Sequence, residues 1–148
     1  MKISTKGRYA VRAMVELAIA DSPRPVLLAY IAKRQEIPER YLVQIFGSLR
    51  RAGLVSSYRG AKGGFQLSRA PAEITLAEIL EASEGKLELV ECLRDDEDRC
   101  NRQGACSTRA MWADINGQVR ALLSKITLAR MVEMHRADQT RLGASYSI

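Results

Sequence analysis

Three cysteines lie close together in the second half of this 148-residue chain. They are Cys92, Cys100 and Cys106, separated by seven and then five residues. Thiolates bind soft metals and iron–sulfur clusters, and accessible thiols can also be oxidised. A zinc site is disfavoured because no C-x2-C pair is present and the single histidine, His135, is remote in sequence. From residue types alone, cluster ligands and redox-active thiols rank equally. Inert thiols rank third, because free cysteines usually lie in cores.

The position of Cys106 favours a reactive or metal-bound thiolate. A helix is predicted to begin near Ser107, and the positive end of a helix dipole lowers the pKa of a nearby thiol. An odd number of cysteines leaves at least one unpaired, and disulfides are rare in cytosolic proteins. No constellation of histidine, serine or paired carboxylates accompanies the cysteines, so a metal-dependent enzyme is disfavoured.

Ahead of the cysteines, residues 28–67 have the pattern of a helix-turn-helix followed by a β-hairpin. Leu28, Ile31 and Ala32 fit one face of a short helix. After a polar turn, Ile37 is placed to pack between two crossing helices, and Pro38 opens the second of them. The apolar residues of that second helix have the i, i+3, i+4, i+7 spacing and are Leu42, Ile45, Phe46 and Leu49. Its other face and its last turn carry Glu39, Arg40, Val43, Gln44, Arg50 and Arg51.

The hairpin that follows has a basic, glycine-rich turn. Gly53 is predicted to end the preceding helix, and strands are predicted at residues 54–58 and 65–67. Between them, Gly60 and two further glycines permit a tight turn, while Arg59 and Lys62 supply positive charge. This order of elements is that of a winged helix-turn-helix, which binds DNA with a helix and a wing. The alternative is an ordinary helical hairpin with a solvated basic face, which we consider weaker.

The expected partner is double-stranded DNA with a near-palindromic operator. Arg40 and Gln44 are candidates for contact with base edges, since their side chains can bond guanine or adenine. Arg59 is expected in a narrow minor groove, and Lys62 is expected to contact phosphate. Arg50 and Arg51 are also assigned to phosphate, and Glu39 to the helix N-terminus rather than to cytosine.

Charge is distributed unevenly along the chain, whose net charge is +6. Residues 1–70 carry 13 Lys/Arg and 4 Asp/Glu, whereas residues 71–100 carry 3 and 10. The basic first half fits a polyanionic partner, and the acidic segment would be repelled by it. No apolar run could span a bilayer, and the N-terminus lacks the apolar core of a signal peptide. We therefore expect a soluble, cytoplasmic protein without a membrane partner.

Two further helices are predicted around this element. The first covers about residues 6–20, with a buried stripe of Val11, Met14, Val15, Ala18 and Ile19. Tyr9 in this helix has two equal interpretations, core packing or contact with a DNA phosphate. The second follows Thr75, an expected N-cap, and ends at Gly85. Its inward residues are Leu76, Ile79 and Leu80, and Glu78 and Glu81 are expected on its exposed face.

A long amphipathic helix is predicted after the cysteines. Its apolar residues alternate three and four apart and are Trp112, Ile115, Val119, Leu122 and Ile126. This pattern favours pairing with a second copy of the chain over packing on the helix's own domain. Thr127 is expected to cap one more short helix, which ends near Met134.

The fold class expected is mainly α with a small β-hairpin wing. We divide the chain into a winged helix-turn-helix (1–70), a connecting helix (71–85), a cysteine-containing sensor loop (86–106), a dimerisation helix with a short terminal helix (107–135) and a flexible tail (136–148).

Four segments of the sequence resemble a known family, the iron–sulfur cluster regulator IscR and its relatives. They are residues 1–14, 41–46, 49–55 and 59–65, and the resemblance runs from residue 1 to about 134. It implies a homodimeric winged-helix repressor or activator, with a long dimerisation helix. It also implies a [2Fe–2S] or [4Fe–4S] cluster held by three cysteines per subunit.

The sequence departs from that family in two ways. Its first two cysteines enclose seven residues, whereas five are common in the family. In IscR a histidine three positions after the third cysteine completes the cluster, but Arg109 stands there. Relatives that sense nitric oxide use an acidic residue near the N-terminus, where this chain has Arg8. A guanidinium cannot bind iron, so the fourth ligand is unassigned. Nearby oxygen donors are Asp95, Asp96, Glu97 and Asp98, which are hard ligands, and water or a small thiol could also serve.

The resulting prediction is a homodimeric, sequence-specific transcription regulator that senses iron–sulfur, redox or nitrosative status through its cysteines. The alternative within the same fold is a regulator controlled by thiol oxidation or by a partner protein, without a cluster.

Overall fold

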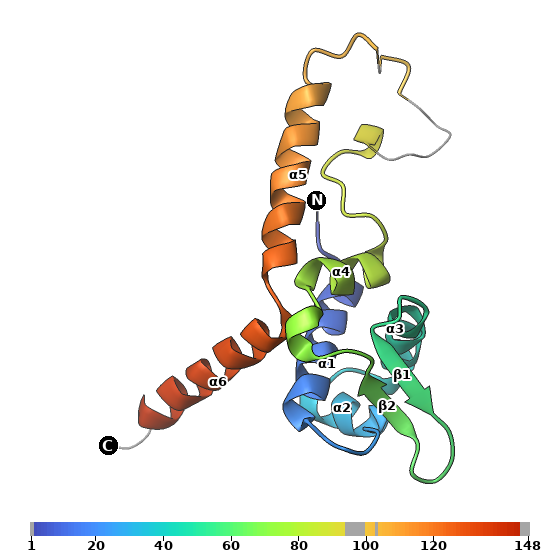
Figure 1. The fold of residues 1–148 in the computed structure, drawn as a ribbon, viewed down its shortest axis with the longest axis vertical. Coiled ribbons are helices and arrows are strands. Elements are labelled where there is room, and N and C mark those ends of the chain that lie inside the picture. Colours follow the sequence, from blue (N-terminus) through green and yellow to red (C-terminus); the bar gives the residue numbers. More distant parts are fainter. Residues whose placement is uncertain (1, 94–99, 103, 146–148) are drawn as a thin grey trace.

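The computed structural model describes residues 2–93, 100–102 and 104–145. A compact helical body carries a two-stranded wing at one end, and a long upright helix rises from the other (Figure 1). The elements in chain order are α1 (Thr5–Ala20), α2 (Leu28–Gln35), α3 (Glu39–Arg51), β1 (Val55–Tyr58), β2 (Gly64–Leu67), η1 (Pro71–Glu73), α4 (Leu76–Glu84), η2 (Glu91–Leu93), α5 (Arg109–Lys125) and α6 (Leu128–Ser145).

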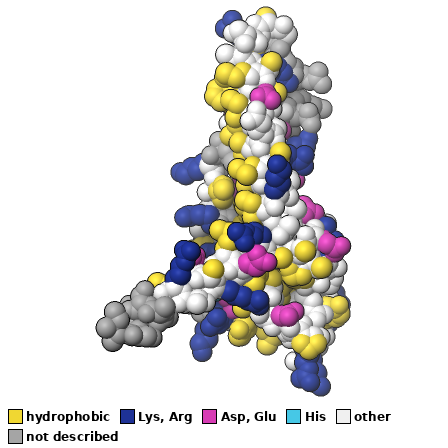
Figure 2. All heavy atoms as spheres, turned by 60° about the vertical axis from the view of Figure 1, so that its left-hand side comes forward, with side chains coloured by type: hydrophobic (Ala, Val, Ile, Leu, Met, Phe, Trp, Pro, Cys, Tyr) yellow, Lys and Arg dark blue, Asp and Glu magenta, His cyan; other side chains and the backbone are white. Residues whose placement is uncertain are grey.

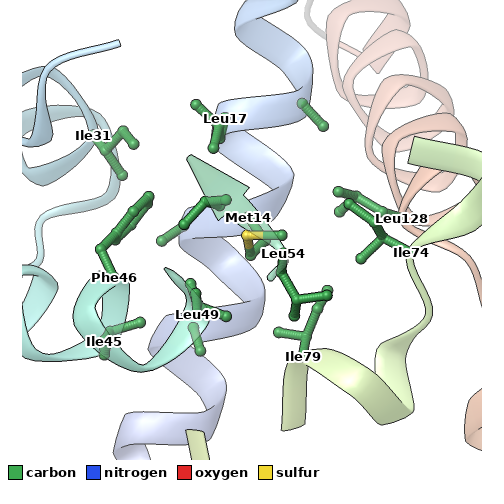
Figure 3. Close-up of a cluster of buried hydrophobic side chains, with 14 of the residues drawn as sticks. Met14, Leu17, Ile31, Ile45, Phe46, Leu49, Leu54, Ile74, Ile79 and Leu128 are labelled. Carbon is green, nitrogen blue, oxygen red and sulfur yellow. The ribbon is translucent and has the colours of Figure 1, made fainter. Parts of the chain in front are cut away.

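Helix α1 lies at the centre of the body and packs against α2, α3, α4 and α6. Met14 and Leu17 of α1 meet Phe46 and Leu49 of α3 and Ile79 of α4 in one core (Figure 3). The predicted stripe of α1 was partly wrong. Ala10, Ala13 and Leu17 are buried in addition to Met14 and Ala18, whereas Val11, Val15 and Ile19 are only half-buried. A helix enclosed by four neighbours buries more than one stripe, and its small alanines permit close approach.

The helix-turn-helix has the predicted buried face. Leu42, Ile45, Phe46 and Leu49 of α3 are buried, and Ile37 is buried between α2 and α3. Of the predicted inward residues of α2, Ile31 is buried and the other two are half-exposed. Pro38 is the N-cap of α3, and Gly53 ends the helix as predicted. The amides of Gly53 and Leu54 donate to the carbonyls of Arg50 and Leu49, which is a Schellman termination.

The wing is an antiparallel pair in which Val55 faces Leu67 and Tyr58 faces Gly64. Val26 extends it with two backbone hydrogen bonds of 2.8 Å to Phe65. The turn requires glycine at position 64, where φ is 140° and an added Cβ would lie 2.5 Å from the Val26 carbonyl oxygen. This contact anchors β2 to the loop before α2, and Phe65 packs edge-on against Phe46 of α3.

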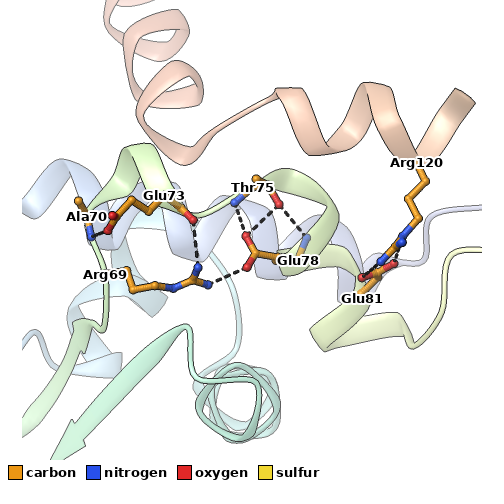
Figure 4. Close-up of polar contacts among 7 residues, drawn as sticks. All are labelled: Arg69, Ala70, Glu73, Thr75, Glu78, Glu81 and Arg120. Carbon is orange, nitrogen blue, oxygen red and sulfur yellow. Dashed lines mark hydrogen bonds and ion pairs between the residues drawn. The ribbon is translucent and has the colours of Figure 1, made fainter. Parts of the chain in front are cut away.

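Helix α4 begins at the predicted N-cap, and its acidic residues are paired. Thr75 and Glu78 form a reciprocal capping box, and the carboxylate of Glu78 also forms an ion pair with Arg69 at 2.7 Å (Figure 4). Partial desolvation raises the pKa of Glu78, but the hydrogen bonds from Arg69 and Thr75 and the charge of Arg69 together bring that pKa below its ordinary value. Arg120 of α5 donates from Nε and Nη2 to the two carboxylate oxygens of Glu81, at 2.8 and 3.2 Å. Glu78 and Glu81, predicted on the exposed face of α4, are half-exposed, and each also joins α4 to another segment.

Helices α5 and α6 leave the body in different directions (Figure 1). Their junction is bound to the core, since Leu128 donates to the Ile74 carbonyl and Leu76 to the Ile126 carbonyl, both at 2.8 Å. Thr127 caps α6 as predicted, through a 3.2 Å bond from the Arg130 amide. The predicted end near Met134 was wrong, because α6 continues to Ser145. Its later residues lose the apolar period but contain no proline, and arginine, alanine, glutamine and leucine favour a helix there.

None of the helices in the described part of the chain is both long and apolar enough to cross a membrane.

Candidate DNA-binding surface and cysteine loop

The outer face of α3 is open to solvent along its first two turns. The amphipathic pattern turns four residues away from the core, and all four are exposed: Glu39, Arg40, Val43 and Gln44. Val43 has 56% of its surface exposed, which is unusual for a valine in a packed helix. The candidates predicted from sequence therefore share one accessible surface, at the end of the helix that enters the major groove in this motif.

The two arginines of the last turn of α3 are exposed, and each donates a hydrogen bond to a serine hydroxyl. Arg50 donates to the Ser57 hydroxyl of β1 at 3.1 Å, and Arg51 donates to Ser48 at the same distance. The first of these bonds links the end of α3 to the wing. Both cations also lie at the negative end of the helix dipole, where positive charge is stabilising.

The wing turn presents its predicted basic residues to solvent. Arg59, Gly60 and Lys62 are exposed, and the turn is closed by a 2.9 Å hydrogen bond from the Gly63 amide to the Gly60 carbonyl. Gly60 has a φ of 98°, which few other residues adopt. The wing and the outer face of α3 are thus two separate basic features joined through the bond between Arg50 and Ser57.

Tyr9 is half-buried and packs against the core, while its ring also meets a second tyrosine. Tyr9 and Tyr41 are arranged edge-to-face, with ring centroids 6.5 Å apart and planes at 69°. The Arg12 guanidinium lies 5.6 Å from the Tyr9 centroid, and that of Arg40 lies 5.3 Å from the Tyr41 centroid. Arg12 and Tyr41 were not among the residues singled out from sequence. The tyrosines are far apart along the chain, so only the fold reveals the pair.

A second group missed from sequence is the buried carboxylate of Glu16. Its side chain is 2% exposed and accepts from Arg34 at 2.9 Å and from Gln35 at 2.7 Å. The bond to Glu16 raises the pKa of Arg34 above its ordinary value. Arg12 in turn donates to the side-chain and backbone oxygens of Gln35. These contacts fix the end of α2, and hence the turn before α3, on the surface of α1.

The cysteines lie between α4 and α5. Cys92 lies in η2 and is half-buried, Cys100 is exposed, Cys106 is half-buried, and all three are free thiols. No three histidine, cysteine, aspartate or glutamate side chains are close enough to hold a metal ion within residues 2–93, 100–102 and 104–145. The predicted oxygen donors at positions 95–98 lie outside the described residues. The donor type fits an iron–sulfur cluster, but a cluster would have to draw these three thiols together.

Cys106 lies just ahead of α5, as the sequence indicated. The Thr108 hydroxyl is 3.5 Å from its sulfur. That hydroxyl and the backbone amides of Thr108 and Arg109 lower the pKa of the Cys106 thiol below its ordinary value, assisted by the charge of Arg102. A thiol of lowered pKa is more readily a thiolate, which is the form that binds metals and reacts with oxidants.

Arg109 connects the first cysteine to the long helix. Its guanidinium donates to the backbone carbonyl of Cys92. Asn116 accepts from the Leu89 amide at 2.9 Å, and Arg120 pairs with Glu81. Residues 109, 116 and 120 lie on one face of α5 because of their helical spacing. That face therefore contacts α4 at Glu81 and the following segment at Leu89 and Cys92.

A different face of α5 is apolar and uncovered. Trp112, Val119 and Ile126 are half-exposed, while Ile115 and Leu122 are 36% and 61% exposed. No residue of α5 is buried. Figure 2 shows hydrophobic side chains along this upright helix, interrupted by lysines and arginines. An uncovered apolar stripe of this length is typical of a surface that packs against another chain.

Comparisons with known proteins agree with this architecture. Residues 3–134 match the Rrf2 family, described as an iron-dependent transcriptional regulator. The HTH-type transcriptional regulator IscR of Photorhabdus laumondii is 39% identical over 132 residues, which are 89% of this chain and 79% of that protein.

Two solved structures have a similar fold. CymR, the global cysteine regulator of B. subtilis, has a TM-score of 0.73 at 38% identity. The matched region covers 90% of this chain and 98% of the CymR chain. IscR of T. potens has a TM-score of 0.72 at 37% identity and covers 94% and 91%. These relatives are regulators rather than enzymes, and their similarity confirms the predicted winged helix-turn-helix fold.

Proposed function

The chain belongs to the Rrf2 family of transcriptional regulators and is a DNA-binding regulator, and from that premise we propose that it acts as a homodimer whose operator affinity depends on an iron–sulfur cluster. The observation that carries the proposal is the position of the cysteines. The backbone carbonyl of Cys92 accepts a hydrogen bond from Arg109, the first residue of α5, and Cys106 lies shortly before that helix. A change at the thiols therefore acts on the helix that bears the uncovered apolar stripe.

In the proposed dimer, the α5 stripes of two chains pack together and set the distance between two copies of α3. Each α3 enters a major groove, and the two grooves are separated by one helical turn of DNA, about 34–36 Å. Arg40 and Gln44 contact base edges, and Tyr9 lies beside them near the backbone. Arg59 and Gly60 of the wing approach the minor groove, while Lys62, Arg50 and Arg51 face phosphates.

The proposed sensor is a cluster held by Cys92, Cys100 and Cys106. When bound, such a cluster supplies a redox-sensitive and nitric-oxide-sensitive centre to the protein. Arg109 cannot be the fourth ligand, because a guanidinium stays protonated, and its bond to Cys92 gives it a structural role instead. Ordering the loop around the cluster would affect α5 through Arg109 and α4 through the pair of Arg120 and Glu81.

A second candidate is control without a cluster, by thiol oxidation or by a partner protein. Two observations favour it. The thiols are not gathered within the described residues, and one similar structure, 35% identical, is that of an oxidised form of Staphylococcus aureus CymR. Visible absorbance of anaerobically purified protein separates the two candidates, because iron–sulfur clusters are coloured and free thiols are not.

Replacing Arg59 with alanine tests the DNA-binding part of the proposal. We expect operator affinity to fall by about tenfold, because the narrow minor groove of the operator has an enhanced negative potential that attracts an inserted arginine. Affinity for random DNA should fall by much less. Fluorescence anisotropy at fixed salt measures both, using an operator selected from a randomised DNA pool. Equal losses on operator and random DNA would reject a specific role for Arg59.

A further inference from the structure

Tyr41, an exposed residue of α3, has no role in the proposed function. Tyr41 lies in the first turn of α3 and has 45% of its surface exposed, although tyrosine rings usually pack. One face of its ring lies 5.3 Å from the Arg40 guanidinium. A guanidinium within about 6 Å of an aromatic centroid is attracted to the ring electrostatically. The ring therefore restricts the positions that the Arg40 side chain adopts in the free protein.

Tyr41 is itself held by a series of contacts that ends in the core. Tyr9 of α1 meets its ring edge-to-face, and Arg12 covers Tyr9. Arg12 is bound to Gln35 at the end of α2, and Gln35 is bound to the buried Glu16. The series thus runs from a buried carboxylate on α1, past the end of α2, to the first turn of α3.

From this arrangement we propose that Tyr41 is a specificity-determining positioning residue, which orients Arg40 for recognition of guanine. The inference rests on the proposed function, in which Arg40 contacts a base edge. An arginine reads guanine through two parallel hydrogen bonds to O6 and N7, so its plane must be fixed. A free arginine side chain loses much rotamer entropy on binding, and a pre-positioned one loses less.

The test compares Tyr41→Leu, which removes the ring, with Tyr41→Phe, which keeps the ring and removes the hydroxyl. Tyr41→Leu should bind the operator about two- to fivefold more weakly, the range expected for one exposed cation–π contact. Its affinity for random DNA and the slope of affinity against salt should not change, because no phosphate contact is lost. Tyr41→Phe should bind like the wild type. If Tyr41→Phe lost as much as Tyr41→Leu, the hydroxyl would contact DNA directly and the proposal would be overturned.

A double-mutant cycle with Arg40→Ala decides whether Tyr41 acts through Arg40. In the Arg40→Ala background, Tyr41→Leu should have no further effect on operator affinity. A persistent effect would overturn the proposal, because Tyr41 would then act by another route. Tyr41→Met, which also removes the ring, serves as a second variant if Tyr41→Leu does not fold, and it should give the same loss.

A measurement on the free protein gives an independent readout. By NMR, the Arg40 side-chain protons should be shifted upfield by the Tyr41 ring in the wild type and return to ordinary values in Tyr41→Leu. Unshifted protons in the wild type would overturn the proposal. Failure of the proposed function would look different, because the wild type itself would then prefer no selected sequence over random DNA.

Discussion

Replacing both Ile115 and Leu122 with aspartate is expected to convert the protein into folded monomers that bind the operator about 100-fold more weakly or worse. Both side chains lie on the uncovered stripe of α5, so the substitutions should leave the fold of a single chain intact. In the dimer, each would bury an unpaired carboxylate at a cost of several kcal/mol. A monomer engages one half-site and loses the gain in affinity that comes from linking two, typically about 10²–10⁴-fold. Sedimentation velocity measures the assembly, against a chain mass of 16.5 kDa.

The matched control places the same charges elsewhere on the same helix. Ala110 and Ala121 are exposed and lie away from the apolar stripe, so Ala110→Asp with Ala121→Asp should remain dimeric and keep its operator affinity. Circular dichroism should show the same helical content in both double variants. A dimeric Ile115→Asp/Leu122→Asp protein would mean that the interface lies on another surface.

The second large effect is expected in the core. Glu16→Ala should lower the free energy of unfolding by about 1.5–3 kcal/mol, the range for hydrogen bonds to a charged group that is buried. The loss leaves the half-buried Gln35 amide without its acceptor, whereas Arg34 is 56% exposed and can turn to water. Urea unfolding at one fixed protein concentration measures the change, because assembly makes apparent stability concentration-dependent.

An exposed ion pair provides the comparison for Glu16. Glu133 and Arg130 of α6 are each 64% exposed and 3.1 Å apart. Glu133→Ala should change the free energy of unfolding by less than about 0.5 kcal/mol. If Glu16→Ala were as mild as Glu133→Ala, the buried carboxylate would not stabilise the turn between α2 and α3.

Local patterns were sufficient to predict most elements. The buried face of α3 follows from its apolar spacing, the start of α4 from Thr75, and the end of α3 from Gly53. Each of these signals lies within a few residues of the feature that it specifies, and each has a direct physical cause. The exposed candidates Arg40, Gln44 and Arg59 follow from the same patterns, since they are what remains after the buried face is assigned.

Contacts between distant segments could not be predicted in this way. Glu16 appears in the sequence as one acidic residue in a helix, and its partners Arg34 and Gln35 belong to the next helix. Tyr9 and Tyr41 meet only because α1 and α3 cross. Likewise, the types and spacing of the cysteines left cluster ligation and redox activity equally ranked, and the hydrogen bond from Arg109 to the Cys92 carbonyl joins residues 17 positions apart.

The most direct test of the proposed function compares the operator affinity of two anaerobic preparations. One is the wild type with its visible absorbance and its iron and sulfide contents recorded. The other is the triple variant Cys92→Ser, Cys100→Ser and Cys106→Ser, which should be colourless yet dimeric with unchanged helical content. We predict that their operator affinities differ by about fivefold or more in either direction, which is the lower end of the range for coupling between two sites. A triple variant that bound the operator with the affinity of the loaded wild type would contradict this prediction, and control by a partner protein would become the better explanation.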